Sequence, residues 1–290
     1  MRASEWSLLV LLSVLWGGTF FFVAVALPEV PPLTLVLARV AIAAVALVAI
    51  ALALGVGLPR RAAAWRSFAV LALLNNVIPF TLIAIGQTRI ASGLASVLNA
   101  TTPLFTLVVA RLFAGEALTW SRLAGVALGM AGVAVLMRPD AAESSLLGMA
   151  CVLGGALSYG FAALWMRRLK DTPPLVSSAA QLVCSTVLML PLAVWVESAH
   201  ALPMPGARAI GAVVGLAVLS TALAYIVFFR ISATAGPANV MLVTLLIPVT
   251  ATALGVLVLG EALTASHVLG ALVIGAGLVV IDGRVFGRRA

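Results

Sequence analysis

Ten long apolar segments run through this sequence, and they restrict the folds it can adopt. A helix needs about 20 apolar residues to cross the hydrocarbon core of a bilayer. Hydrophobic residues make up 63% of the chain and charged residues 9%, which leaves too little polar surface for a protein dissolved in water. The sequence therefore predicts an all-α membrane protein with ten transmembrane helices. The expected spans are 6–27, 33–54, 67–86, 92–113, 120–137, 146–168, 175–196, 209–230, 236–259 and 265–284.

The net charge and the first apolar segment each allow another interpretation. A formal charge of +8 is compatible with nucleic-acid binding, but the basic residues occur in short groups between apolar segments, so we expect no nucleic-acid partner. Segment 6–27 follows Arg2 as in a signal peptide, yet it contains no A-x-A-like cleavage site. We therefore expect it to be the first span, in contact with the lipid bilayer.

One stretch of the sequence occurs twice in similar form. "PLFTLVVARLFAGEALT" begins at Pro103 and "PVTATALGVLVLGEALT" begins at Pro248, 145 residues later in a chain of 290. Each repeat would contain five spans, an odd number, so the second copy must cross the membrane in the opposite direction. This pattern predicts an inverted 5+5 repeat around a central cavity, with residues 1–143 as the first unit and 144–290 as the second.

Basic residues between the spans predict the orientation. If the N-terminus is cytoplasmic, the cytoplasmic side holds thirteen basic residues and the opposite side holds three, Arg89, Arg138 and Arg208. Cytoplasmic loops of membrane proteins carry such an excess of Lys and Arg. We therefore expect both termini in the cytoplasm.

Polar residues and prolines near the middle of the spans indicate where a solute binds. Pro103 and Pro248 interrupt the helical hydrogen bonding of the fourth and ninth expected spans, and we assign them to gating, although a kink needed only for packing is the alternative. Asn75 and Asn76 fall at mid-depth in the third span, and Tyr225 in the eighth. Such residues line a solute path by default, or else they bond neighbouring helices.

Three charged residues at span ends or inside a span leave two interpretations each. Arg39 lies within the second span, where its side chain either snorkels to the interface or anchors a substrate carboxylate. Glu116 and Glu261, from the two "GEALT" copies, are expected mainly at helix ends, with gating as the alternative. Thr119 and Thr264 are placed to cap the next helix.

The sequence predicts no catalytic residue, no metal site and no cofactor. Cys151 and Cys184 lack neighbours at metal-ligand spacing, and His200 and His267 are far apart at interfaces. All nine acidic residues lie in loops or near span ends, whereas proton-coupled carriers usually rely on an acidic residue or a histidine inside the membrane. We therefore expect facilitative transport or exchange rather than tight proton coupling.

The stretch "WGGTFF" at Trp16, the ten spans and the two P-x12-"GEALT" motifs resemble the drug/metabolite transporter superfamily, and specifically its EamA-type exporters. The stretch "NNVIPFTLIAIGQTRIASGLASVLNATTP" is most similar to bacterial exporters of aromatic and other neutral amino acids. The resemblance implies alternating access, export across the bacterial inner membrane and a central cavity. Residues at cavity positions would be Trp16, Asn75, Asn76, Pro79, Asn99, Pro103, Tyr159, Tyr225 and Pro248.

Aromatic side chains and the scarcity of buried charge indicate the substrate. Phe20, Trp165 and other rings could line the cavity beside Arg39, which suits a neutral or aromatic amino acid, unless these rings are ordinary core residues. The alternatives are a multidrug or other-metabolite exporter, and a non-transporting membrane scaffold or receptor. An intramembrane enzyme would need a nucleophile beside a base, which the sequence does not offer. The protein could act as a monomer or as a homodimer.

Overall fold

The protein is a bundle of helices. The computed structural model describes residues 3–59, 61–117, 119–136, 145–197, 204–235, 240 and 243–282, and every regular element in these ranges is helical. The boundary expected between residues 143 and 144 lies outside the described residues. The elements are α1 (Ala3–Ala26), α2 (Pro32–Ala53), α3 (Ala62–Ala72), η1 (Leu73–Val77), α4 (Ile78–Gln87), α5 (Ser92–Asn99), α6 (Thr102–Ala114), α7 (Trp120–Leu136), α8 (Leu146–Met166), η2 (Arg167–Leu169), α9 (Pro174–Glu197), α10 (Ala207–Ala217), η3 (Val218–Leu223), α11 (Ala224–Ala235), α13 (Val243–Leu259) and α14 (Ala265–Asp282).

The lengths of the helical segments confirm a multi-pass membrane architecture in part. Within the described residues, seven segments are long and apolar enough to cross a bilayer: Ala3–Ala26, Pro32–Ala53, Ala62–Gln87, Ser92–Ala114, Leu146–Leu169, Pro174–Glu197 and Ala207–Ser232. Trp120–Val135, Leu246–Leu259 and Ala265–Ile281 are apolar but shorter. These three correspond to the fifth, ninth and tenth expected spans, so a count of ten full-length spans stays a prediction.

Two of the long segments contain a turn of π-helix. The third expected span runs through α3, η1 and α4, and the eighth through α10, η3 and α11. The π-turns begin at Leu73 and Val218, so their spacing equals the 145 residues that separate the duplicated stretches. A π-turn adds a residue to the helical turn and is frequent at functional sites.

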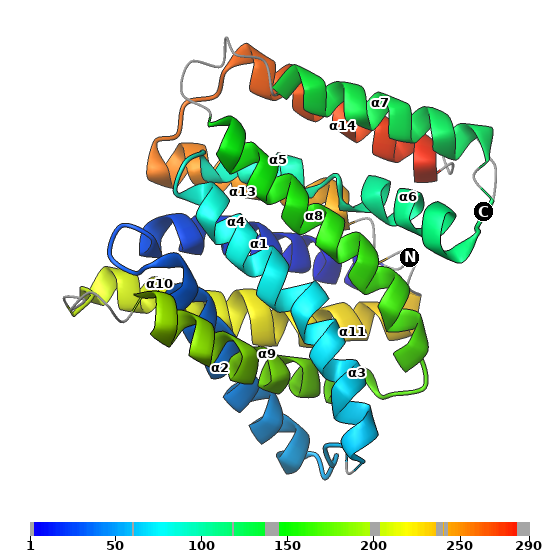
Figure 1. The fold of residues 1–290 in the computed structure, drawn as a ribbon. Helices are drawn as coiled ribbons and strands as arrows, with labels where there is room; N and C mark the ends of the chain where they lie inside the picture. The colour runs from blue at the N-terminus through cyan, green and yellow to red at the C-terminus, as the bar shows by residue number, and fades with distance from the viewer. Residues whose placement is uncertain are drawn as a thin grey trace.

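Successive segments run back and forth, so the bundle has two ends (Figure 1). At one end, on the left in Figure 1, α1 is followed by α2, α4 by α5 and α13 by α14. We call it the Glu261 end, because it also carries Glu29, Glu197 and Glu261. The opposite end, where α1 begins and α6, α8 and α14 end, is called the Glu116 end.

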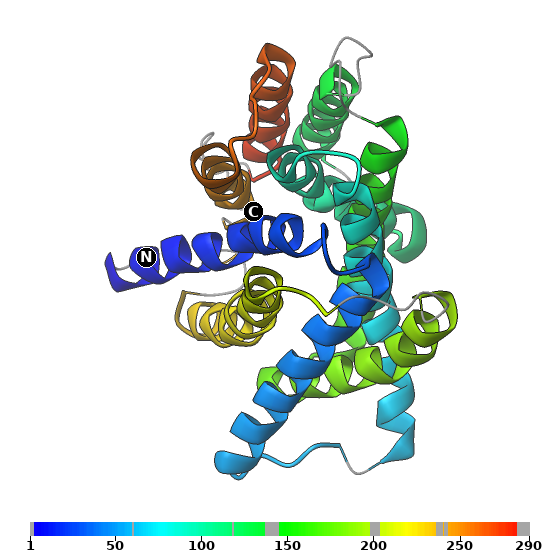
Figure 2. The same ribbon diagram turned by 90° about the vertical axis from the view of Figure 1, so that its left-hand side faces the viewer.

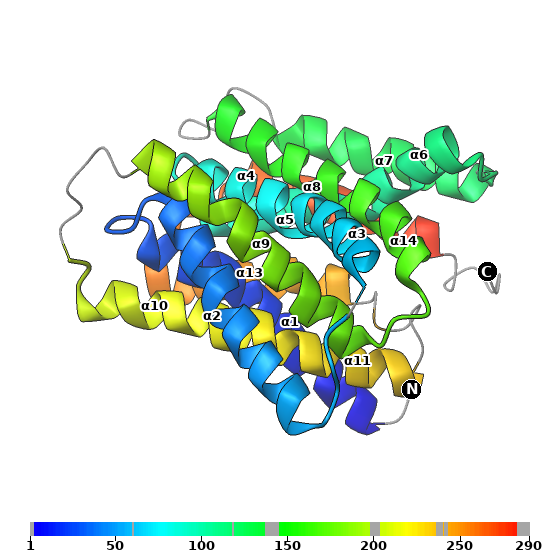
Figure 3. The same ribbon diagram turned by 60° about the horizontal axis from the view of Figure 1, so that its bottom comes forward.

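The packing joins segments that lie far apart in the sequence. α1 lies between α13 on one side and α10 and α11 on the other (Figure 2). α2 packs along α9 in the part of the bundle that Figure 3 brings forward. α7 and α14 pair along one edge of the molecule (Figure 1).

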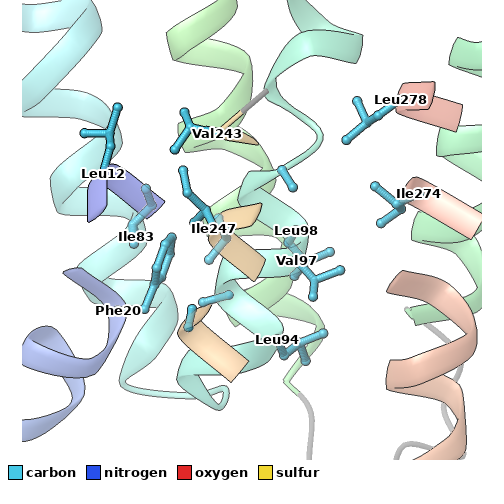
Figure 4. Close-up of a cluster of buried hydrophobic side chains, with 14 of the residues drawn as sticks. Leu12, Phe20, Ile83, Leu94, Val97, Leu98, Val243, Ile247, Ile274 and Leu278 are labelled. Atoms are coloured by element: carbon cyan, nitrogen blue, oxygen red, sulfur yellow. The ribbon is translucent and has the colours of Figure 1, made fainter. Parts of the chain in front are cut away.

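Two large clusters of buried apolar side chains form the core. The first joins α1, α4, α5, α13 and α14 through residues that include Leu12, Phe20, Ile83, Leu98 and Ile247 (Figure 4). The second is built mainly on α2, α9 and α10. Tyr159 packs against both clusters, so this side chain lies where the two cores meet.

Candidate functional site

Arg39 is buried in the first half of α2, with only 7% of its surface exposed. Its Nε donates a hydrogen bond to Thr221 Oγ1 at 3.0 Å, and its guanidinium carbon lies 3.6 Å from the centre of the Phe80 ring. Tyr159 and Tyr225 are close enough to interact with the charge electrostatically. The interpretation that Arg39 snorkels to the interface is therefore wrong, because its head group is held in the core by residues of α4 and η3.

The paired amides of η1 contact α9. Asn75 Nδ2 donates to Gln181 Oε1 at 3.0 Å, and Asn76 Nδ2 donates to Ser185 Oγ at 2.9 Å. Ser185 in turn donates to the backbone carbonyl of Gln181. The first and second halves of the chain thus meet through polar side chains at mid-depth. We refer to Arg39, Asn75, Asn76, Gln181, Ser185 and Thr221 as the central polar cluster.

Several enclosed side-chain oxygens have no hydrogen-bond partner among the described residues. Three of them are Asn76 Oδ1 in η1, Ser220 Oγ in η3 and Asn99 Oδ1 at the end of α5, and each is enclosed and accepts no hydrogen bond. A buried unpaired acceptor costs about 1–3 kcal/mol. Asn76 and Asn99 are residues that the sequence assigned to a solute path, and Ser220 is an addition from the structure.

The two prolines differ in their surroundings. Pro103 lies in the first turn of α6, after a break at residues 100–101, and the Asn99 carbonyl accepts a hydrogen bond of 2.7 Å from the Thr102 hydroxyl. The carbonyl that the proline deprives of an N–H partner is therefore satisfied by a neighbouring side chain. Pro248 lies inside the continuous helix α13. The fourth segment is thus broken, and the ninth is continuous over its described part.

The aromatic candidates are spread over the bundle. The half-buried Trp16 ring lies 5.5 Å from the ring of Phe228. Phe20 is buried in the first core cluster, where its carbonyl accepts a hydrogen bond from Gln87. Trp165, near the end of α8, donates to the Ser67 carbonyl and lies under the Arg168 guanidinium. Phe20 and Trp165 therefore have structural partners away from the polar cluster.

Pro79 and Tyr225 flank the cluster. Pro79 is buried in the first turn of α4, one turn after Asn75, and Gly155 of α8 packs against it. Tyr225 is half-buried at the start of α11 and stacks on Phe229 with a centroid distance of 6.1 Å. A surface groove of about 450 Å³ is lined by Leu27, Pro28, Glu29, Val30, Pro31, Met204 and Pro205. It lies at the Glu261 end, away from these residues.

Three carboxylates at the Glu261 end bind helix N-termini across the two halves of the chain. Glu261 accepts hydrogen bonds from the backbone N–H groups of Ser92, at 2.7 Å, and Gly93, at 3.0 Å, where α5 begins. The other two are Glu197, which accepts from Leu33 N, Thr34 N and Thr34 Oγ1 at the start of α2, and Glu29, which accepts from Gly206 N before α10. A carboxylate at a helix N-terminus satisfies free N–H groups and complements the helix dipole.

The two "GEALT" copies are used differently. Glu116 pairs with the Arg167 guanidinium, and both side chains are largely exposed. This hydrogen bond to Arg167 is the main reason why the pKa of Glu116 lies below its ordinary value. The expected caps are confirmed, because Thr119 Oγ1 accepts from Arg122 N and Thr264 Oγ1 accepts from His267 N. Both contacts join the two halves of the chain, but Glu261 binds backbone N–H groups at the start of α5, whereas Glu116 binds an exposed arginine.

Gln181 and Ser185 are cluster members that the sequence did not single out. They stand four residues apart in an apolar helix, which places them on one face. This polar i, i+4 pair was the available signal, but its partners lie more than 100 residues away. No metal-binding group of three or more His, Cys, Asp or Glu residues occurs within the described ranges.

Comparison with known proteins identifies the family. The sequence profile of the EamA-like transporter family matches residues 4–138 and again residues 146–282. The chain belongs to this family. The resemblance to the drug/metabolite transporter superfamily is thereby confirmed, and the protein is a multi-pass membrane transporter of this family.

The sequence similarity to relatives of this EamA-family chain extends over almost its whole length. The chain is 28% identical to the uncharacterised transporter YvbV of Bacillus subtilis, over 98% of this chain and 93% of the relative. It is 27% identical to the uncharacterised inner membrane transporter YedA of Escherichia coli K12, over 95% and 90%. A probable terminal-alkyne amino-acid exporter of Streptantibioticus cattleyicolor is 28% identical, over 100% and 96%. A solved crystal structure with a TM-score of 0.69 and 21% identity covers 97% of this chain and 99% of its own, which supports the fold alone.

Proposed function

We propose that this EamA-family protein exports small neutral metabolites, above all amino acids including aromatic ones, by facilitative alternating access. The observation that carries the proposal is the central polar cluster. It places one guanidinium, two amides from η1 and two polar side chains from α9 in the middle of an apolar bundle. Intramembrane polar groups of this kind usually belong to a substrate path.

The proposal includes an inverted repeat made of residues 1–143 and 144–290. It is supported by the two matches of the family profile, one in each half, and by π-turns that begin 145 residues apart. In carriers with inverted repeats the two units rock about a fixed site near the bilayer midplane. The unequal use of Glu116 and Glu261 fits a state in which the Glu261 end is closed. Pro103 and Pro248 would act at the helices that move.

The charge distribution supports the orientation. With both termini in the cytoplasm, the Glu261 end faces away from it, and the Glu116 end, with Arg111, Arg167 and Arg168, faces the cytoplasm. Substrate would then enter from the cytoplasm and leave at the Glu261 end. The name of the E. coli relative agrees with the inner membrane as the location.

The chemistry of the described core supports facilitative movement of a neutral solute. The acidic residues that it contains bind helix N-termini or Arg167, or lie at helix ends, and the central polar cluster includes no carboxylate or imidazole. The half-buried rings of Trp16, Tyr159 and Tyr225 fit an apolar side chain. The name of the Streptantibioticus cattleyicolor relative, a probable terminal-alkyne amino-acid exporter, is compatible with an amino-acid cargo.

The test is uptake into proteoliposomes with a panel of labelled amino acids, with and without a pH gradient. We expect saturable, counterflow-stimulated exchange of aromatic and other neutral amino acids that a pH gradient does not drive uphill. Inhibition by broad organic cations without amino-acid flux would instead support a multidrug exporter. Concentrative, pH-driven flux would contradict the facilitative mechanism.

Replacing Asn76 by leucine should separate transport from folding. Asn76 is fully buried, and its Oδ1 has no partner in the described structure. Leucine has the same number of side-chain heavy atoms and removes this unpaired acceptor, together with the hydrogen bond that Asn76 Nδ2 donates to Ser185 Oγ. Ser185 keeps its hydrogen bond to the Gln181 carbonyl. The loss of the bond to Ser185 and the removal of the unpaired acceptor oppose each other, so we expect thermal stability to change little. Exchange should fall by about tenfold or more, the effect of losing one buried substrate hydrogen bond.

The matched control is Ser178→Ala, which also removes an enclosed hydroxyl without a partner, from the first turns of α9. We expect it to preserve both stability and exchange. If Asn76→Leu lowers stability and leaves exchange per folded molecule intact, Asn76 serves helix packing rather than the substrate path.

A further inference from the structure

Arg39 is a buried cation for which the described structure provides no counter-ion. It is the one basic side chain classed as buried in the described ranges. The carboxylates of Glu29, Glu197 and Glu261 are occupied by backbone N–H groups at the Glu261 end, and Glu116 is paired with Arg167. Desolvating a charge costs several kcal/mol unless a partner of opposite sign compensates it. None of these four carboxylates is available to Arg39, so among the described contacts its compensating negative charge is left to a bound molecule.

The contacts of Arg39 fix its orientation and leave its fork free. Nε donates to Thr221 Oγ1, which itself donates its proton to the Leu216 carbonyl at 2.9 Å, so this hydroxyl has no proton left for a solute. One face of the guanidinium is covered by the Phe80 ring. The two terminal nitrogens make no hydrogen bond to the described residues, and their planar fork matches a carboxylate in a bidentate geometry.

We propose that Arg39 binds the carboxylate of the transported solute, so that the substrates among the neutral metabolites are those with a single carboxylate, above all amino acids. This inference rests on the proposed export function and specifies which part of the solute is recognised. A single guanidinium suits one negative charge, whereas a phosphate dianion would call for further cations that the described core does not hold. The ammonium group of an amino acid should contribute less to binding. The unpaired oxygens of the two π-turns, Asn76 Oδ1 in η1 and Ser220 Oγ in η3, carry no negative charge.

The position of the anchor couples it to both halves of the chain. Arg39 belongs to α2 and Phe80 to α4, whereas Thr221 lies in the π-turn η3 of the second half. A bound carboxylate would therefore be held by a side chain whose orientation depends on contact between the halves. Thr221 acts as a positioning residue, since it fixes the guanidinium without being needed to touch the solute.

The test measures ligand binding as a thermal shift and as competition with labelled phenylalanine, in purified full-length protein. The probes are phenylalanine, 3-phenylpropionate, which lacks the amine, and phenethylamine, which lacks the carboxylate. We expect 3-phenylpropionate to compete within about tenfold of phenylalanine and phenethylamine to be at least 100-fold weaker. Equal competition by phenethylamine and 3-phenylpropionate would overturn the proposal.

Variants of Arg39 and Thr221 test whether Arg39 is the residue that binds the carboxylate. Arg39→Lys keeps the charge but loses the fork, and Arg39→Gln loses both. We expect the Kd for 3-phenylpropionate to rise about 10- to 100-fold, as for the loss of a charge-assisted hydrogen bond, with the smaller rise in the lysine variant. If Arg39→Gln does not fold, the nearly isosteric variant Thr221→Val provides the test. A Kd that rises about 3- to 10-fold for 3-phenylpropionate and does not change for phenethylamine supports the positioning role of Thr221. An unchanged Kd for 3-phenylpropionate in Arg39→Lys and Thr221→Val would refute it.

The outcomes distinguish this inference from the proposed function. If phenylalanine is exchanged but its binding is indifferent to Arg39 and to its carboxylate, the anchor is wrong and the export function stands. If 3-phenylpropionate binds through Arg39 but no amino acid is exchanged, the anchor stands and the amino-acid cargo is wrong. Binding of inorganic phosphate with equal strength would contradict the monocarboxylate class.

Discussion

Replacing Glu261 by glutamine is expected to open the Glu261 end of the bundle and to expose the buried side chain of Ser92. The carboxylate accepts two backbone hydrogen bonds where α5 begins, and both cross from the second half of the chain to the first. Glutamine keeps an acceptor but loses the negative charge that strengthens both bonds and complements the helix dipole. A loss of about 1 kcal/mol per bond corresponds to a shift of roughly tenfold or more in the ratio of open to closed molecules.

The measurement uses a cysteine reporter. Ser92→Cys is nearly isosteric, and Ser92 is 1% exposed between α5 and α13, so its labelling by a membrane-impermeant maleimide reports separation of these helices. The native Cys151 and Cys184 are first replaced by alanine. We expect the labelling rate to rise about tenfold or more when Glu261→Gln is added.

Glu116→Gln is the matched control, because it changes the corresponding residue of the other "GEALT" copy. Its partner Arg167 and Glu116 itself are exposed, and such pairs contribute about 0–1 kcal/mol. We therefore expect little change in labelling at position 92. Equal labelling rates in the two variants would show that Glu261 does not close this end.

Replacing Gly17 by valine is expected to prevent stable packing of α1 against α13. A Cβ at position 17 would clash with Thr250 Oγ1 and would lie 3.0 Å from the backbone nitrogen of Ala251, so the helices themselves would have to separate. Thr250 Oγ1 also donates to the Ser13 carbonyl at 2.7 Å, a bond that the separation would stretch. Overpacking costs typically about 1–3 kcal/mol, and more where backbone must move.

Thermal unfolding in detergent and the monodisperse yield after purification are the measurements for Gly17→Val. We expect a large loss of folded protein. Gly211→Val is the control, because nothing lies within 4 Å of a Cβ at that position of α10. It should change the unfolding temperature little. A Gly17→Val protein as stable as Gly211→Val would mean that the close contact between α1 and α13 is not needed.

Gly160 provides a second case of the same kind. A Cβ there would lie 3.1–3.2 Å from backbone atoms of Phe105 and Thr106, so α8 approaches α6 closely. Gly17 follows Trp16 in the first half of the chain, and Gly160 follows Tyr159 in the second half. Sequence reasoning placed these glycines beside aromatic residues, but it did not show that they allow helices to approach.

Much of the candidate site could be foreseen from the sequence because lipid penalises polar groups wherever they occur. Asn75, Asn76 and Arg39 stand out in apolar spans without any knowledge of their neighbours. Their partners could not be foreseen, since Gln181 and Ser185 are more than 100 residues away and Thr221 is 182 residues from Arg39. The expectation that Arg39 snorkels was wrong for this reason: depth along the helix was known, but the direction of the side chain was not.

By itself, the sequence determined that this protein lies in a lipid bilayer, that it is helical, which family it belongs to, and that a pattern recurs after 145 residues. These properties follow from local composition and from period, which any stretch of chain carries with it. Only the tertiary structure decided that η1 and η3 form π-turns, that Glu261 binds the start of α5 while Glu116 contacts Arg167, and that Arg39 turns into the core. Such choices depend on which helix lies beside which, because a buried donor or charge takes the partner that packing brings within about 3 Å.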